Sequence, residues 1–332
     1  MSELVGAVLT RPSIEAGAAA AVLRRSWGIE GALRSLPSER DRNFAVAVDG
    51  EDRFVLKISN AAEDRGFLDL QHRAMDRLAA AGVPCQRVVP TPGGFEVIDI
   101  GDASAQSLAR LLTWLPGRPL ATLPAGDRPA VLLEDLGRVM GRTAAALHGF
   151  DHPAAHRSFQ WSAERSLDVI ARHAPEVADA GRATLLERWR RRLAPLADRF
   201  ASLRPGVIHN DANDHNVLVA DDGRSISGLL DLGDAVWSVA VNELAVAAAY
   251  AALGATDPLG VLGWVRTGFE EALVLTEAES AVLPDLVALR LATSVSLSAH
   301  QSRLAPDDPY LTVSEEAAWE LLDRLISTAP DR

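Results

Sequence analysis

The stretch at residues 206–234 constrains the fold more than any other part of the chain. It reads GVIHNDANDHNVLVADDGRSISGLLDLGD, in which two apolar runs, 217–219 and 226–230, flank Asp221-Asp222-Gly223. An Asp-Gly pair between two apolar runs is typical of a β-hairpin. Such a hairpin brings the polar residues before its first strand towards those after its second. The sequence therefore predicts that Asp211, Asn216 and Asp231 lie close together beside buried strands.

This trio of side chains suits magnesium-phosphate chemistry. Mg²⁺ prefers oxygen ligands, usually one or two carboxylates with phosphate oxygens and water, so we expect Asn216 and Asp231 to be metal ligands. Asp211 is then available to orient a substrate hydroxyl and accept its proton as the hydroxyl attacks the terminal phosphate of a nucleotide. The alternative is a hairpin whose Asp and Asn residues are merely solvated loop residues.

The spacing H-x-D-x-x-x-x-N, followed by D-x-G-D at 231–234, resembles the catalytic and metal loops of eukaryotic-like kinases. It looks most like the aminoglycoside phosphotransferase and choline kinase superfamily, and HNDANDHN is similar to its hydroxylysine kinase-like branch. Leu232 departs from the Phe of many relatives, at a position that packs rather than binds metal. The same wording occurs in kinase domains fused to class III aminotransferases, so the resemblance implies association or fusion with an aminotransferase among relatives.

The resemblance covers nearly the whole chain and implies an α+β, protein-kinase-like fold with two lobes. We expect a nucleotide-binding N-lobe at 1–112, built on a small antiparallel sheet, and a mainly helical C-lobe at 113–332 for catalysis and substrate binding. Residue periodicity and turn signals agree with this division. They predict strands at 31–36, 43–48, 53–58, 86–90 and 95–100, and helices at 13–27 (Ser13 as N-cap, Gly28 as stop), 64–81, 131–148, 238–253, 260–275, 279–300 and 314–326.

Lys57 is the only lysine in the chain, because all the other residues among the 33 Lys and Arg are arginine. A compact ammonium that reaches a phosphate is poorly replaced by the wide planar fork of Arg. Lys57 is therefore either a phosphate ligand or an exposed strand residue kept by chance. The resemblance implies that it pairs with the α and β phosphates of the nucleotide. Gln71 stands where kinases offer this lysine a glutamate, and whether Gln71 replaces that partner stays open.

Two further segments resemble nucleotide-binding parts of kinases. The loop 38–43 stands where protein kinases have a glycine-rich phosphate cover; it contains no glycine. Turn-favouring residues such as Ser38 and Asn43 can still direct backbone N–H groups at phosphate, although an ordinary surface turn explains the loop equally well. LARLLTWLPG at 108–117 resembles the hinge between lobes, so the backbone from Thr113 to Leu115 is expected to face the base of ATP or GTP.

Three residues are candidates for contacting the substrate. Asp214 lies three residues past Asp211 in the same loop and is the best-placed carboxylate for a substrate ammonium group. Glu243 lies between apolar residues of a predicted helix, where it either contacts a substrate amine or caps buried backbone. Arg290 lies in a segment that looks similar to the branch's C-terminal part, and it is a candidate for a carboxylate contact.

Composition sets the remaining bounds. The formal net charge of −12 disfavours nucleic acid as a partner and slightly favours a cationic small-molecule substrate. The single cysteine, Cys85, suits a reducing compartment. The N-terminus lacks the pattern of a signal peptide, and the longest apolar run, 244–256, is too short to span a bilayer. We therefore expect a cytoplasmic protein without a membrane partner.

Three functions remain open at this point. The first is a Mg²⁺-dependent kinase that phosphorylates a small hydroxyl-bearing amino acid or amino alcohol, similar to hydroxylysine. The second is an aminoglycoside antibiotic O-phosphotransferase, which shares every catalytic residue. The third is a nucleotide-binding module that has lost catalysis.

Overall fold

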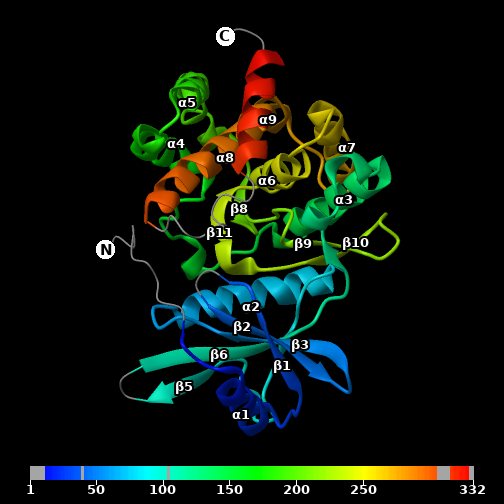
Figure 1. Ribbon diagram of the computed structural model, residues 1–332. Coiled ribbons are helices and arrows are strands. Elements are labelled where there is room, and N and C mark those ends of the chain that lie inside the picture. The colour runs from blue at the N-terminus through cyan, green and yellow to red at the C-terminus, as the bar shows by residue number, and fades with distance from the viewer. Residues whose placement is uncertain (1–11, 39–40, 103–104, 305–314, 329–332) are drawn as a thin grey trace. The chain divides into compact units, whose positions relative to one another are not determined.

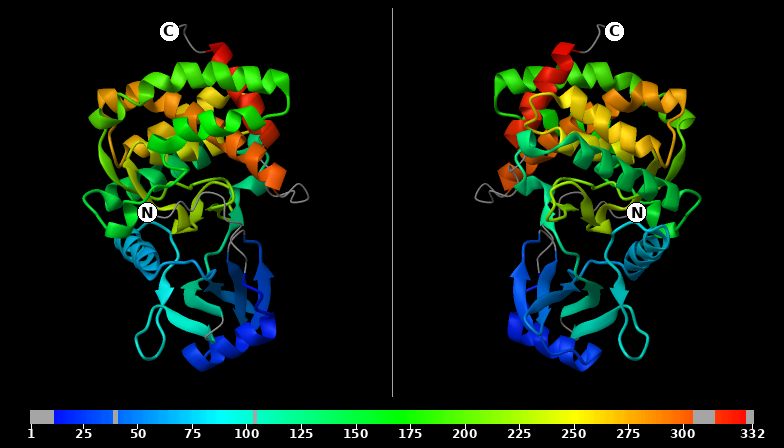
Figure 2. Two further views of the ribbon diagram at one scale, coloured as in Figure 1. Left: turned by 90° about the vertical axis from the view of Figure 1, so that its left-hand side faces the viewer. Right: turned by 90° about the vertical axis from the view of Figure 1, so that its right-hand side faces the viewer.

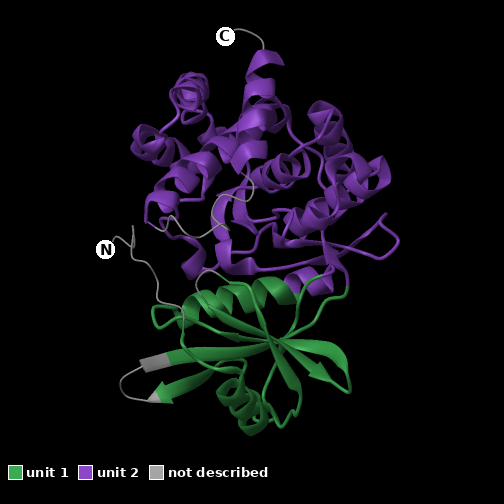
Figure 3. Ribbon diagram, in the orientation of Figure 1, with its two compact units in different colours: residues 1–76, 85–116 green, residues 77–84, 117–332 purple. Residues whose placement is uncertain are grey.

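The computed structural model describes residues 12–38, 41–102, 105–304 and 315–328. The chain divides into two compact units, which are coloured separately in Figure 3. Unit 1 comprises residues 1–76 and 85–116, and unit 2 comprises residues 77–84 and 117–332. The units therefore part at Pro116 and Gly117, a few residues beyond the predicted boundary at 112 and 113, and a short piece of the first part of the chain belongs to unit 2.

Unit 1 is built on an antiparallel sheet (Figure 1). Its strands pair in the order β1 (Ala32–Leu36), β2 (Arg42–Val48), β3 (Glu51–Ile58), β6 (Ala105–Thr113) and β4 (Val88–Val89), and β5 (Ile98–Asp102) also pairs with β6. The predicted strands at 31–36, 43–48 and 53–58 are confirmed. The segment compared with a kinase hinge is largely strand β6.

The two faces of this sheet differ, as the alternation of side chains along a strand requires. Helix α1 (Ala16–Trp27) packs on the apolar face, where Phe44, Leu56 and Leu111 are fully buried. Helix α2 (Arg65–Ala80) lies on the other face, as Figures 1 and 2 show. On that second face Asn43, Lys57 and Arg110 are directly opposite one another on β2, β3 and β6.

Helix α1 ends as predicted but begins later. Gly28 adopts the left-handed conformation with φ 69°, which favours glycine, and its N–H caps the helix on the carbonyl of Arg24. The N-cap is Glu15 rather than the predicted Ser13, and its side chain makes no capping hydrogen bond. Ser13 was therefore the wrong start, because the chain only turns helical at Ala16.

Within the described residues, unit 2 contains two small sheets beside and within the stretch at 206–234. Strands β9 (Val217–Val219) and β10 (Ile226–Leu229) pair antiparallel, and β7 (Arg118–Pro119) pairs with β9, so the predicted hairpin is confirmed. Strand β8 (Pro205–Ile208) pairs with β11 (Val236–Val239). The helix predicted to start at residue 238 was wrong at this end, because Val236 and Val239 are buried strand residues paired with β8.

Helices make up most of the rest of unit 2 (Figure 1). They are α3 (Ala130–Leu147), α4 (Ala163–His173), α5 (Ala180–Leu193), α6 (Asn242–Ala251), α7 (Pro258–Glu270), α8 (Glu277–Leu304) and α9 (Glu315–Thr328). Helices α3 and α7 approach so closely that a Cβ on Gly137 would lie 1.9 Å from the carbonyl oxygen of Val265. Helix α8 is long and apolar enough to cross a membrane, but 78% of its most apolar window is buried inside the protein, as in a core helix.

Candidate active site

The loop between β8 and β9, residues 209–216, is held in place by the carboxyl group of Glu243. One oxygen of this carboxyl accepts the N–H of His209 at 2.5 Å, and the other accepts the N–H of Asn210 at 3.2 Å. Asn210 has φ 67°, a left-handed conformation that Asn tolerates better than most residues. Glu243 is completely buried, which raises its pKa to about 7. Of the two predicted roles, the structure therefore shows the capping of buried backbone, and the proposed contact of Glu243 with a substrate amine is corrected.

His209 links this loop to the chain before Asp231. The N–H of Asp211 donates to its Nδ1 at 3.2 Å, so Nδ1 is an acceptor and the ring proton lies on Nε2. Nε2 then donates to the carbonyl of Leu230 at 2.9 Å. Burial lowers the pKa of His209, which favours this neutral form. The histidine is therefore a fixed connection between the two polar clusters and not a proton carrier.

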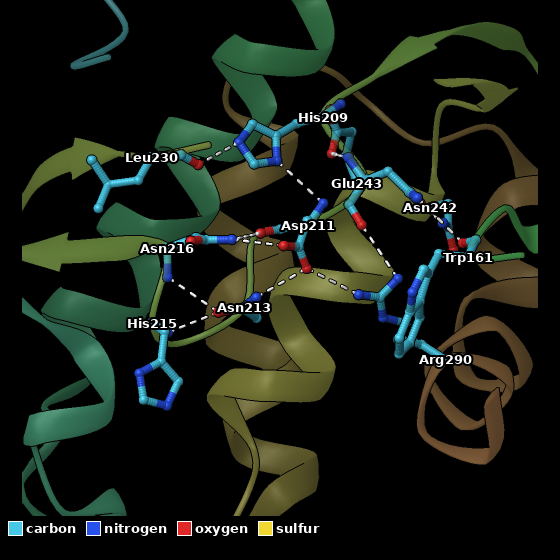
Figure 4. Close-up of polar contacts among 11 residues, drawn as sticks. Trp161, His209, Asp211, Asn213, His215, Asn216, Leu230, Asn242, Glu243 and Arg290 are labelled. Carbon is cyan, nitrogen blue, oxygen red and sulfur yellow. Dashed lines mark hydrogen bonds and ion pairs between the residues drawn. The ribbon is translucent and has the colours of Figure 1, made fainter. Parts of the chain in front are cut away.

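Asp211 is held by three side chains (Figure 4). Asn213 and Arg290 donate to its Oδ1 at 3.0 and 3.1 Å, and the Nδ2 of Asn216 donates to its Oδ2 at 2.7 Å. Burial, reinforced by the negative charge of Asp234, raises the pKa of Asp211 to about 8 although Arg290 opposes the shift. A carboxyl with a raised pKa and a fixed orientation is suited to accept a proton near neutral pH.

Arg290 reaches Asp211 from helix α8. Its Nη1 donates to the carbonyl of Asn210 at 3.3 Å, and its guanidinium lies over the ring of Trp161 at 4.4 Å and near that of Tyr250 at 5.4 Å. The side chain is 4% exposed. Arg290 was predicted to contact a carboxylate of the substrate, and the structure shows its guanidinium bound to the carboxylate of Asp211.

Asn216 and Asp231 fit a magnesium ion chemically. Because Nδ2 of Asn216 donates to the carboxylate and carbonyl of Asp211, its Oδ1 remains as a neutral oxygen ligand. The N–H of Leu230 donates to the carbonyl of Asn216 at 2.8 Å. This hydrogen bond holds the backbone just before Asp231 beside Asn216. Asp231 has φ 57°, and a Cβ on Gly233 would lie 2.8 Å from its Oδ1. Gly233 thus allows the turn in which its N–H donates to Asp231 at 2.9 Å.

Asp214 differs from the other loop residues. Its carboxylate lies 3.9 Å from Nη2 of Arg128, and its side chain is only 11% exposed. Burial raises its pKa, while His215 and Arg128 oppose the shift. Arg128 is itself fixed, because it donates to the carbonyl of Ala251 at 3.0 Å. Asp214 was predicted as the carboxylate for a substrate ammonium, but it already faces a cation of its own chain.

Lys57 lies in unit 1 and its side chain is buried between the neighbouring strands that carry Asn43 and Arg110. Gln71 of α2 accepts a hydrogen bond at 2.7 Å from Nη2 of Arg110. Gln71 was compared with the glutamate that pairs with this lysine in kinases, and its carbonyl oxygen binds Arg110, which lies opposite Lys57 on the next strand. Ser38 accepts the N–H of Asp41 at 3.2 Å, as expected of a turn residue.

The segment compared with a hinge is tied into unit 1. Thr113 donates its N–H to the carbonyl of Arg87 at 2.9 Å and accepts from Gln86 at 3.2 Å through its own carbonyl. The next N–H, that of Trp114, donates to Arg53 at 2.9 Å. The backbone of Thr113 was expected to face the nucleotide base, but its N–H and its carbonyl are both hydrogen-bonded to residues of unit 1. Leu115 follows as a half-buried residue outside the strands.

A model of the phosphotransferase enzyme family matches residues 33–272. The chain belongs to this phosphotransferase family. Hydroxylysine kinase of Danio rerio is 30% identical to it over 97% of this chain and 94% of the relative. Hydroxylysine kinase of Bos taurus is 29% identical over 96% of this chain and 90% of the relative. The prediction that this phosphotransferase is a kinase acting on a hydroxyl group is confirmed.

Solved structures show the same fold. A microcompartment-associated aminopropanol kinase matches with a TM-score of 0.69 and 17% identity, over 92% of this phosphotransferase and 96% of that chain. An amicoumacin kinase in complex with AMP-PNP and Ca²⁺ matches with a TM-score of 0.66 and 17% identity, over 89% of this phosphotransferase and 88% of that chain. The predicted kinase-like α+β fold is thereby confirmed.

Sequence reasoning missed three residues of the site. Asn213 donates to Asp211 and also accepts the N–H groups of His215 and Asn216, at 2.9 and 3.1 Å. Trp161 stacks on Arg290 and accepts a hydrogen bond from Asn210 through its carbonyl at 3.2 Å. Asn242 donates to Asn210 at 3.1 Å. Asn213 could have been found because it stands inside HNDANDHN, whereas Trp161 and Asn242 carry no local signal.

Proposed function

We propose that this phosphotransferase transfers the terminal phosphate of ATP or GTP, in a Mg²⁺-dependent reaction, to the hydroxyl of a small amino acid or amino alcohol. Our first choice of acceptor is 5-hydroxylysine. The observation that carries the proposal is the set of hydrogen bonds to the carboxylate of Asp211. Asn213, Arg290 and Asn216 orient its two oxygens. The hydroxylysine kinases that match over nearly the full chain support the choice of acceptor.

In the proposed reaction the acceptor hydroxyl donates a hydrogen bond to Asp211. As the hydroxyl oxygen attacks the terminal phosphorus, its proton passes to the carboxylate and the bond to the nucleoside diphosphate breaks. Asn216 and Asp231 would hold Mg²⁺, which neutralises charge on the transferred phosphoryl group when it is bound. The raised pKa of Asp211 makes it a stronger base than an exposed carboxylate.

The nucleotide phosphates are proposed to pair with Lys57. Its burial fixes the direction of a side chain that would otherwise be flexible, and a fixed ammonium is a good phosphate ligand. Ser38 and Asn43 lie on the loop and strand before it and remain proposed contributors, together with the backbone of Leu115 for the base. Calorimetric titration of Asp231→Ala with Mg-nucleotide tests the metal assignment, because unchanged affinity and unchanged metal dependence would contradict it.

We propose that the acceptor ammonium meets Asp214. Its carboxylate lies 3.9 Å from Arg128, and its Oδ1 has no hydrogen-bond partner among the described residues. An acceptor with one ammonium close to its hydroxyl fits a single carboxylate. Aminoglycosides carry several ammonium groups and call for a broader acidic surface.

A coupled assay of nucleoside diphosphate release tests the acceptor. The panel is hydroxylysine, homoserine, threonine, ethanolamine, choline and kanamycin, each with ATP and with GTP. We expect the highest kcat/KM with hydroxylysine. If kanamycin turns over well while every amino acid and amino alcohol stays at background, the antibiotic O-phosphotransferase function replaces our proposal.

We further propose that the enzyme acts in the cytoplasm, without nucleic acid or a membrane as partner. Cys85 is consistent with this, because burial raises the pKa of its thiol to about 11 and keeps it protonated and unreactive. Association with an aminotransferase is retained only as a proposal for relatives of this chain.

A further inference from the structure

A second cluster of potential metal ligands lies in unit 2, apart from the catalytic loop. His173 ends helix α4, Glu176 follows it in a short 3₁₀ turn, and His300 lies near the end of helix α8. Helices α4 and α8 pack side by side (Figure 1). The cluster therefore joins two elements that are more than a hundred residues apart in the sequence.

The three side chains converge on one point. Nδ1 of His173 lies 2.9 Å from Oε1 of Glu176, and Nδ1 of His300 lies 3.0 Å from Oε2 and 3.3 Å from Oε1 of the same carboxylate. The two imidazole rings are 4.2 Å apart between centroids. Both rings thus present the same nitrogen to a single carboxylate, and the three ligand atoms lie within 4.8 Å of one another.

This geometry matches a site for a transition metal. With Zn–N and Zn–O bonds of about 2.0–2.2 Å, neighbouring ligands of a tetrahedral site lie roughly 3.3 Å apart, close to the separations above. Two imidazoles and one carboxylate are a ligand set of zinc sites whose fourth position is open to water, whereas Mg²⁺ prefers oxygen ligands alone. His173 is 7% exposed, and His300 and Glu176 are 28% and 18% exposed, so solvent can supply a fourth ligand.

We propose that His173, Glu176 and His300 bind a zinc ion or a similar divalent transition metal. Arg303 approaches Glu176 at 3.5 Å, but its side chain is 66% exposed and can turn into solvent when a cation enters. Pro175 lies between His173 and Glu176 and restricts the backbone that presents these two ligands.

The site would fix the last turns of α8 against the end of α4. Arg290 lies on α8 ten residues before His300, about 15 Å along the helix, and Trp161, on which it stacks, lies just before α4 begins at Ala163. Metal binding is therefore expected to stabilise the packing of α4 on α8 without contributing a group to the reaction. Metal binding by these three residues is independent of which acceptor the enzyme phosphorylates.

The test uses the full chain without a histidine tag, stripped with a chelator and dialysed. We expect it to bind one equivalent of Zn²⁺ by mass spectrometry of the metal content, and to show the strong visible absorption of tetrahedral Co²⁺ when Co²⁺ is added. The Tm should rise by several degrees with Zn²⁺. Mg²⁺ should produce no such rise in an Asp231→Ala background, in which the proposed magnesium ligand is removed.

Two variants of the site and one control make the result decisive. His300→Ala and Glu176→Gln should each lower Zn²⁺ affinity at least about tenfold, by analogy with the loss seen when even supporting groups of metal sites are removed. His156→Ala removes an exposed histidine that is also hydrogen-bonded to a carboxylate, Asp151, at 2.6 Å, and should bind as wild type. Zinc affinity equal in wild type, His300→Ala and Glu176→Gln, or no zinc bound by the stripped wild type, overturns the proposal.

Discussion

The loop around Asp211 in unit 2 and the strand residues around Lys57 in unit 1 hold their polar side chains by different means. In the loop, Asp211 is bound by Asn213 and Asn216, which lie two and five residues further along the chain. In unit 1, Lys57 lies opposite Arg110 on another strand, and the partner of Arg110 is Gln71 on a helix. Apart from the contact with Arg290 of helix α8, the arrangement around Asp211 is local in sequence, whereas the arrangement around Lys57 joins three separate elements.

This difference decides what a sequence motif can predict. The spacing of residues in a local turn fixes how their side chains lie, so the motif around Asp211 correctly predicted that Asn216 lies beside it. The partner of a strand residue is chosen by packing between elements, so comparing Gln71 with the glutamate of kinases did not predict its hydrogen bond with Arg110. The predictions that follow compare the two regions.

The largest effect is expected in the loop, from Asp211→Asn. The substitution is nearly isosteric but removes the proton acceptor, so kcat should fall by about 10²–10⁴ while Mg-nucleotide affinity stays unchanged. Steady-state kinetics and calorimetry measure the two quantities. Near-wild-type turnover would contradict the assignment of Asp211 as the base.

Glu243→Ala should cause the next largest effect, on stability. It leaves the buried N–H groups of His209 and Asn210 without their acceptor, at a cost of about 1–3 kcal/mol for each group. The free energy of unfolding should therefore fall by roughly 2–6 kcal/mol in urea titrations. The matched control is the exposed Glu187→Ala, which should change stability very little. Equal stability of the two variants would show that Glu243 does not support the loop.

The two regions should respond to pH in opposite directions. Burial, with the positive charge of Arg110, lowers the pKa of His72 in unit 1 from 6.5 to about 4, although the neighbouring Glu96 opposes this. The stability that neutral His72 contributes is thus present above pH 6.5 and lost as the pH falls towards 4. Burial raises the pKa of Glu243 from 4.5 to about 7, so its contribution is present below pH 4.5 and lost as the pH rises towards 7.

Measuring the free energy of unfolding between pH 4 and 7 in His72→Gln and Glu243→Gln checks these signs. Relative to wild type, His72→Gln should lose less stability on acidification, and Glu243→Gln should lose less on going to neutral pH. Each difference should reach at most about 3 kcal/mol. Variants whose pH profiles run parallel to the wild-type profile would show that neither pKa is shifted by folding.

The smallest effects are expected in unit 1. Lys57→Arg should still bind nucleotide but position it badly, with kcat/KM about 10- to 100-fold lower. Gln71→Glu should change kcat/KM by less than about threefold, because Gln71 accepts a hydrogen bond from Arg110 and a carboxylate can make the same contact. A large change in nucleotide KM for Gln71→Glu would instead mean that a carboxylate at this position captures Lys57.

The sequence by itself determined the hairpin around residues 206–234 and the places of Asp211, Asn216 and Asp231 beside it, because turn chemistry and apolar periodicity act over a few residues. The kinase-like fold followed from the resemblance of these motifs to a known family. Only the tertiary structure decided that Glu243 supports the backbone of His209, that Arg290 binds Asp211, and that Asp214 faces Arg128. Each of these contacts joins residues from different elements. A buried charge must find a partner, and which partner it finds depends on how whole helices and strands pack.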